Sequence, residues 1–200
     1  MTKAAKFLLL AAKGALVVLL LSIAASVGLA REKYETIEAQ AFGTGTQMSQ
    51  NIGIKVMIYE FSPPEAKQSL VDAFMKGQNQ GLVNALTKMP AVGRIAITGT
   101  LGYDLSFIRQ IPTPTGRKIR FVTNRQIRFG EAWADTQSQA YNLTAGEFDL
   151  NDQDKGKSTG ILYPAAQLII DKEGQLQFEL RQNAWRLSGI LDWPGTKGEN

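Results

Sequence analysis

The 200-residue chain contains neither cysteine nor histidine. Without cysteine it has no disulfide, no thiolate ligand for zinc, no thiol nucleophile and no attachment point for a lipoprotein anchor. Without histidine it lacks the side chain that most often titrates near neutral pH, and a Ser-His-Asp triad is excluded. These two absences rule out many classes of hydrolase, redox enzyme and metalloprotein, and we expect neither a cofactor nor a metal site.

The formal net charge of +4 is unevenly distributed. Three of the 22 basic residues, Lys3, Lys6 and Lys13, lie within residues 1–30, where there is no acid. The rest of the chain therefore has 19 basic against 18 acidic residues. A nearly neutral body lacks the extended positive surface of a nucleic-acid-binding protein, so nucleic acid is an unlikely partner and any basic surface must be local.

Residues 1–30 have the pattern of a secretory signal peptide. Lysines precede an apolar run from Gly14 to Gly28, and the small residues Gly28 and Ala30 come just before Arg31. We expect export to the periplasm or the cell exterior, with a mature protein that begins at Arg31. The alternative is an uncleaved membrane anchor, because the longer apolar stretch from Phe7 to Ala30 approaches the ~20 residues that span a bilayer. In both cases the positive charge places the body outside the cytoplasm.

The next segments predict two strands followed by a pair of helices. The first strand covers Tyr34 to Phe42, and apolar residues alternate over 54–58. Ser62, Pro63 and Glu65 have the spacing of a capping box, which predicts a helix whose apolar residues include Leu70 and Phe74. Gly77 is expected to end this helix, and Pro90 to end a second one.

From Val92 onward the pattern is that of strands separated by turns. About seven or eight antiparallel strands are expected, so the fold class is α+β, mainly antiparallel β-sheet, sandwich-like or curved, with one helical pair inserted after the second strand. One domain is expected over residues 31–192, with a flexible tail over 193–200. An outer-membrane barrel is the less favoured alternative, because the helical pair interrupts the strands and the tail is polar.

Charge is segregated along the middle of the chain. Six basic residues and no acid occur between Leu105 and Gly130, and six acids and no base between Glu131 and Asp154. The basic residues are Arg109, Arg117, Lys118, Arg120, Arg125 and Arg128. Either the two runs pair across neighbouring strands, or several of the basic side chains form a surface that binds anions.

The candidate ligand-binding residues are Arg117, Lys118, Arg120 and Arg128. We expect most of them to be paired with acids, and any that remain free to be Arg117 or Lys118, because these two follow the turn at Gly116. For an exported protein the candidate partners are an anionic glycan, a lipid head group or an envelope polymer.

Other motifs carry little functional information. Residues 149–160 resemble a calcium loop only at its first positions, and Gly160 stands where a bidentate Glu is required. The glycine pairs lack the spacing of a phosphate-binding loop. Among the tryptophans, Trp185 is expected in the core and Trp193 at the surface.

The sequence therefore favours an exported, non-catalytic binding or envelope-associated structural module with a local basic surface. One alternative is an exported hydrolase that uses an Asp/Glu pair, for which Glu147 and Asp149 share a strand face. No feature of the sequence singles out the catalytic residues of such an enzyme. The other alternative is a membrane-anchored assembly component.

Overall fold

The computed structural model describes residues 35–44, 51–125, 143–173, 176–178 and 184–195. The expected leader, Arg128 and most of the expected tail lie outside these residues. Residues 33–200 form one compact unit. Within the described residues, no helix is long and apolar enough to cross a membrane.

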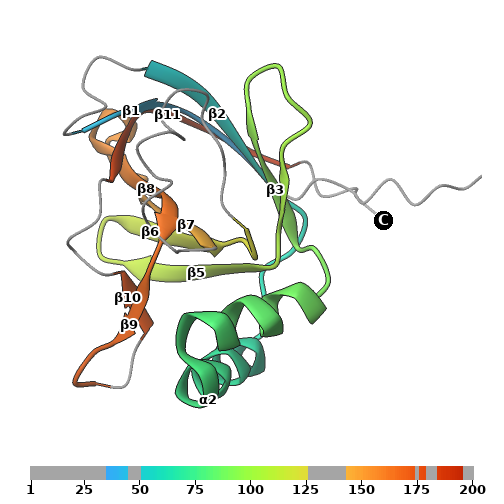
Figure 1. Ribbon diagram of the computed structural model, residues 1–200. Helices are drawn as coiled ribbons and strands as arrows, with labels where there is room; N and C mark the ends of the chain where they lie inside the picture. Colours follow the sequence, from blue (N-terminus) through green and yellow to red (C-terminus); the bar gives the residue numbers. More distant parts are fainter. Residues whose placement is uncertain (1–34, 45–50, 126–142, 174–175, 179–183, 196–200) are drawn as a thin grey trace, which may run out of the picture. The chain divides into compact units, whose positions relative to one another are not determined.

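Antiparallel strands dominate the structure, as the sequence predicts (Figure 1). The large sheet has the order β4-β3-β2-β1-β11-β8-β7-β6-β5. Its strands are β1 (Glu35–Phe42), β2 (Asn51–Ile58), β3 (Gly93–Ile97), β4 (Tyr103–Leu105), β5 (Phe107–Thr113), β6 (Gly116–Val122), β7 (Leu143–Asn151), β8 (Thr159–Ala166) and β11 (Trp185–Pro194). A separate pair consists of β9 (Leu168–Ile170) and β10 (Leu176–Phe178), and a 3-10 turn covers Lys155–Lys157.

The large sheet curls until it is nearly closed. Its two edge strands, β4 and β5, are consecutive in the chain and are separated only by Ser106. The backbone N–H of Ser106 donates to the carbonyl of Val122 on β6, while the carbonyl of Leu105 accepts from Val92 beside β3. One bent stretch of chain therefore serves both edges, which leaves less unpaired strand edge exposed.

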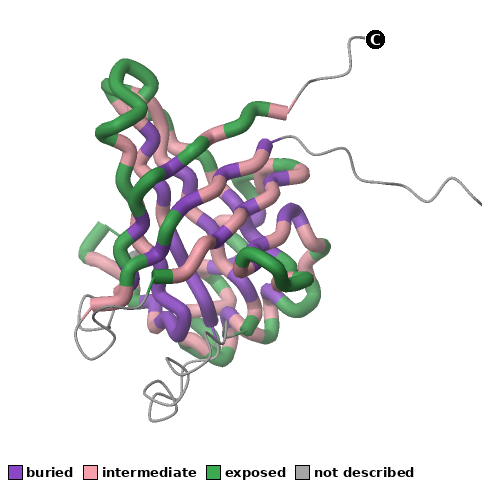
Figure 2. Tube along the Cα trace, turned by 90° about the horizontal axis from the view of Figure 1, so that it is seen from above, coloured by how far each residue is buried: buried purple, intermediate pink, exposed green. Residues whose placement is uncertain are grey.

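Alternation along the strands places one set of side chains inside the curled sheet. Ile37 on β1, Phe121 on β6 and Phe148 on β7 are fully buried there, and so is Trp185 on β11, as expected. Figure 2 shows the resulting alternation of buried and less buried positions along the strands. Gly146 has no room for a side chain, because a Cβ atom there would lie 2.3 Å from Cζ of Phe121.

A helical element, α2 (Pro64–Lys88), packs on the outer face of β5 to β8. Its buried residues Leu70, Leu82 and Leu86 form a second apolar cluster with Phe107 and other outward-facing residues of these strands. The expected pair of helices is present as one element with a break, because Gly77 and Gln78 have non-helical backbone angles. Phe74 is only partly buried in this cluster.

The predicted capping box at Ser62 is wrong. The helix begins at Pro64, its N-cap residue is Pro63, and no side chain caps it. Ser62 instead binds the edge of the sheet: its N–H donates to the carbonyl of Ile108, and its hydroxyl accepts from the N–H of Ile108 at 3.1 Å. A local motif was therefore overridden by a tertiary contact.

Strand β11 continues to Pro194, two residues beyond the expected end of the domain at 192. Trp193 is 57% exposed on this strand, which confirms the expected contrast with the buried Trp185. β11 pairs with both β1 and β8, so the last strand of the fold lies beside the first.

Candidate functional site

The basic and acidic runs form β6 and β7, which are neighbouring strands. The register places Lys118 opposite Asp149 and Arg120 opposite Glu147. Lys118 Nζ lies 3.0 Å from Glu147 Oε1 and 3.2 Å from Asp149 Oδ2, and the Nε–H of Arg120 donates to Glu147 Oε2. Cross-strand ion pairing is therefore confirmed for Lys118 and Arg120, and the expectation that Lys118 stays free is wrong.

Glu147 is the centre of this outer group. Burial alone would raise its pKa, but the hydrogen bonds and charges of Arg120 and Lys118 together lower the pKa below its usual value. Hydrogen bonds to Glu147 raise the pKa of Lys118 in turn, against the effect of partial burial. Both carboxylates that the sequence offered as a catalytic pair, Glu147 and Asp149, are thus engaged with cations.

Arg117 is the most enclosed of the three predicted site residues that the structure describes, and the expectation that it stays free is wrong. Its position pairs with Leu150, so its side chain shares the inner face of the sheet. The guanidinium donates to both carboxylate oxygens of Glu35, at 3.0 and 2.8 Å, and to Asp192 Oδ2 at 2.6 Å. Although Arg117 follows the turn at Gly116, it is not exposed. Its side chain lies on the inner face of the sheet, where it contacts Glu35 of β1 and Asp192 of β11.

The inner cluster of Glu35, Arg117 and Asp192 holds two carboxyl groups and one guanidinium. Burial, with Glu35 only 2% exposed, raises the pKa of Glu35 to about 7, and a hydrogen bond and charge from Asp192 add to this rise while Arg117 opposes it. A proton on Glu35 makes the cluster neutral overall and provides a donor for Asp192. Because Arg117 and Glu35 are 82 residues apart in the sequence, no local motif could have predicted the cluster. Glu35 does, however, share strand parity with the apolar Ile37, which was a usable signal for burial.

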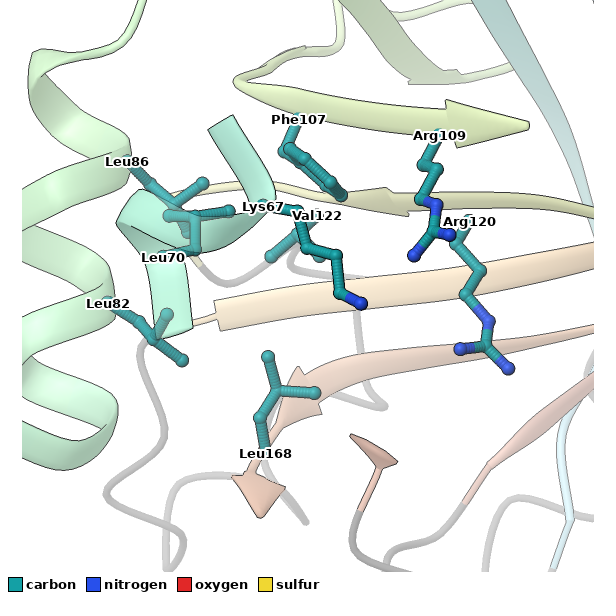
Figure 3. Close-up of a pocket in the computed structure, with 9 residues that line it drawn as sticks. All are labelled: Lys67, Leu70, Leu82, Leu86, Phe107, Arg109, Arg120, Val122 and Leu168. Carbon is teal, nitrogen blue, oxygen red and sulfur yellow. The ribbon is translucent and has the colours of Figure 1, made fainter. Parts of the chain in front are cut away.

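An open apolar cavity of about 70 Å³ lies between α2 and the outer face of β5 and β6. In Figure 3 the labelled leucines of α2 lie on one side of this cavity and Arg109 and Arg120 on the other, while Lys67 extends from α2 towards the arginines. The leucines are Leu70, Leu82 and Leu86, and the cations are Lys67, Arg109 and Arg120. The only predicted site residue at this cavity is Arg120; Arg117 and Lys118 do not line it, and Arg128 lies outside the described residues.

Arg109 was part of the basic run but was not among the predicted site residues. The register places it directly opposite Arg120 on β6. Like charges at such paired positions, with Cα atoms about 5 Å apart, destabilise a sheet. The guanidinium of Arg120 is compensated by Glu147, whereas the guanidinium of Arg109 has no ion pair or hydrogen bond to any residue that the structure describes. A cation with no acidic partner among the described residues therefore stands at the mouth of an apolar cavity.

Within the described residues, no three acidic side chains are grouped so as to hold a metal ion. Comparison of the chain with protein-family models, with curated proteins and with solved structures finds no match. The functional hypothesis is therefore based on the chemistry of the cavity and its cationic side chains.

Proposed function

We propose that the protein is an exported, non-catalytic binding module that holds an anionic group at the mouth of the cavity between α2 and β5–β6. The observation that carries this proposal is the position of Arg109, which faces Arg120 and has no acidic partner among the described residues. Export rests on the leader-like residues 1–30.

The arrangement of the cations supports binding of a single anionic group. Lys67 on α2 and Arg109 on β5 line both the cavity and an adjoining groove of about 630 Å³, so the two features meet at these side chains. A carboxylate, phosphate or sulfate placed there would accept hydrogen bonds from a guanidinium, which offers paired donors in a planar fork. It would also relieve the repulsion between the two facing arginines.

The alternative of a hydrolase with a carboxylate pair has less support. The best-formed pair is Glu35 and Asp192, but Arg117 occupies both oxygens of Glu35. The cavity beside Asp192 measures about 10 Å³, which is close to the space of a single water molecule. A sugar ring or peptide group does not fit the cavity at Asp192, and Glu35 is buried and bound to Arg117, so a structural role suits this pair better.

The proposal is tested by retention on a sulfated polysaccharide matrix at low salt. We expect the double variant K67Q/R109Q to lose retention that the wild type shows. The matched control is K172Q/R186Q, which removes the same amount of charge from exposed positions away from the cavity.

Equal loss of retention in both double variants would mean that net charge alone causes binding, and would contradict the proposed site. A wild type that elutes at the lowest salt concentration would contradict the proposed function as a whole. Melting temperatures of all variants serve as a check, because an exposed charge contributes little to stability.

A further inference from the structure

We propose that the ligand of this site is an anionic amphiphile with one unbranched alkyl chain, whose first carbons enter the cavity while its head group binds Arg109. This inference rests on the proposed function and makes the ligand lipid-like, in contrast to a glycan. Its basis is that apolar and cationic surfaces meet within one small cavity.

The cavity wall selects an apolar tail. Leu82 and Leu86 from α2 and Phe107 from β5 are buried and line it. These three side chains have no donor or acceptor for a sugar hydroxyl. Burying a hydroxyl without a hydrogen-bond partner costs free energy. A hydrocarbon chain meets no such penalty, so the lining favours methylene groups.

The size of the cavity limits the tail to one chain. Its volume of about 70 Å³ is less than half of the ~150 Å³ of an apolar cavity that binds benzene. A short stretch of a single alkyl chain fits this space, and the adjoining groove, which shares Lys67, Phe107 and Arg109 with the cavity, leaves room for the head group.

The head group is placed by the cations. Arg109 and Arg120 project from neighbouring strands beside the cavity, and Lys67 extends towards them from α2 (Figure 3). A head group at this point lies within reach of Arg109 while its tail points at the leucines. The site requires an anionic group on an alkyl chain, and a carboxylate or a phosphate would both serve as that group.

The test is a series of calorimetric titrations of the full chain with acetate, butyrate, hexanoate and octanoate. We expect affinity to rise with chain length by on the order of 50-fold and then to level off before octanoate, because the small cavity holds about three methylenes and each buried methylene contributes roughly fourfold. Octanol, which has the tail without the charge, should bind more weakly than octanoate. Octyl phosphate in place of octanoate shows which of the two head groups is preferred, and a lack of binding by both would overturn the inference.

Two matched pairs of variants test where the alkyl tail and the anionic head group of the ligand bind. Val122→Phe, which fills the cavity, should remove the gain from chain length, whereas Ile111→Phe on the same outer face but outside the cavity should retain it. Arg109→Gln should reduce octanoate affinity to that of octanol, and Arg186→Gln should leave it unchanged.

The outcome separates the two proposals. If acetate and octanoate bind equally and Arg109→Gln abolishes both, the anion site stands and the amphiphile is wrong. If no anion binds and the polysaccharide matrix retains nothing, both proposals are wrong. The comparison of ligands on the wild-type chain needs no variant, so it remains decisive if Val122→Phe fails to fold.

Discussion

Glu35, Arg117 and Asp192 show how a few residues can make the stability of the molecule depend on pH. Two carboxyl groups share one guanidinium at the end of the curled sheet. With both carboxyls ionised the cluster carries a net negative charge in a buried place, which is costly. With Glu35 protonated the charges balance, so the native state favours the proton.

The first prediction concerns pH. The pKa of Glu35 is about 7 in the native state against an ordinary value of 4.5, so between these values the native state binds a proton that the unfolded state does not. Stability from this group is present below about pH 4.5 and is lost as pH rises through about 7. The free energy of unfolding should fall by roughly 3 to 4 kcal/mol over this window, since one pKa unit corresponds to ~1.4 kcal/mol.

Urea unfolding at a series of pH values measures this effect. Glu35→Gln keeps the size of the side chain and removes its titration, so the variant should show a much flatter profile between pH 5 and 8. The control Glu38→Gln changes a side chain that is 39% exposed on the same strand and should keep the wild-type profile. Identical profiles for wild type and Glu35→Gln would contradict a proton held by Glu35.

At the scale of elements, the packing of α2 on the sheet depends on the break at Gly77 and Gln78. Gln78 has φ 48° and ψ −140°, a left-handed conformation that residues with a side chain rarely adopt. The break changes the direction of the helix between Leu70 and Leu82, both of which are buried in the cluster under α2. Packing of two leucines on the sheet thus compensates for strain at one residue.

The second prediction follows from that strain. Gln78→Gly should raise the free energy of unfolding by roughly 0.5 to 2 kcal/mol, because relief of a strained conformation outweighs the added entropy of glycine in the unfolded chain. The matched control is Gln80→Gly, an exposed position with helical geometry two residues later, which should lower stability by about 1 kcal/mol. Thermal unfolding gives both signs, and a loss of stability in both variants would contradict strain at Gln78.

At the scale of the whole molecule, β11, the last strand, closes the fold by pairing with the first strand, β1. It pairs with β1 and with β8, and it carries both a fully buried and an exposed tryptophan. Trp185 is among the largest side chains inside the curled sheet, whereas Trp193 faces solvent where the strand ends.

The third prediction compares these two residues of one strand. Trp185→Ala should lower the free energy of unfolding by about 3 to 5 kcal/mol, through lost burial and the cavity that remains. Trp193→Ala should change it by less than about 1 kcal/mol, as expected for a surface position. Denaturant unfolding followed by circular dichroism measures both, and equal costs would mean that β11 is not packed as described.

The sequence by itself determined the class of fold and the positions of most elements. Alternating apolar residues predicted the strands, and Gly77 and Pro90 marked the break and the end of the helical element, because these signals depend on neighbours in the chain. It also offered pairing of the basic and acidic runs across neighbouring strands as one of two interpretations, and the structure shows this pairing for Lys118 and Arg120. Pairing of consecutive strands needs only a register that keeps the apolar face inward.

Only the tertiary structure decided which charged residues meet at long range. Closure of the sheet brought Glu35 and Asp192 to Arg117 from positions that are 82 and 75 residues away in the sequence. Packing of α2 on the sheet made the cavity and placed Arg109 at its mouth. The curvature of the sheet and the packing of its faces depend on all strands at once, so no segment read alone contains that information.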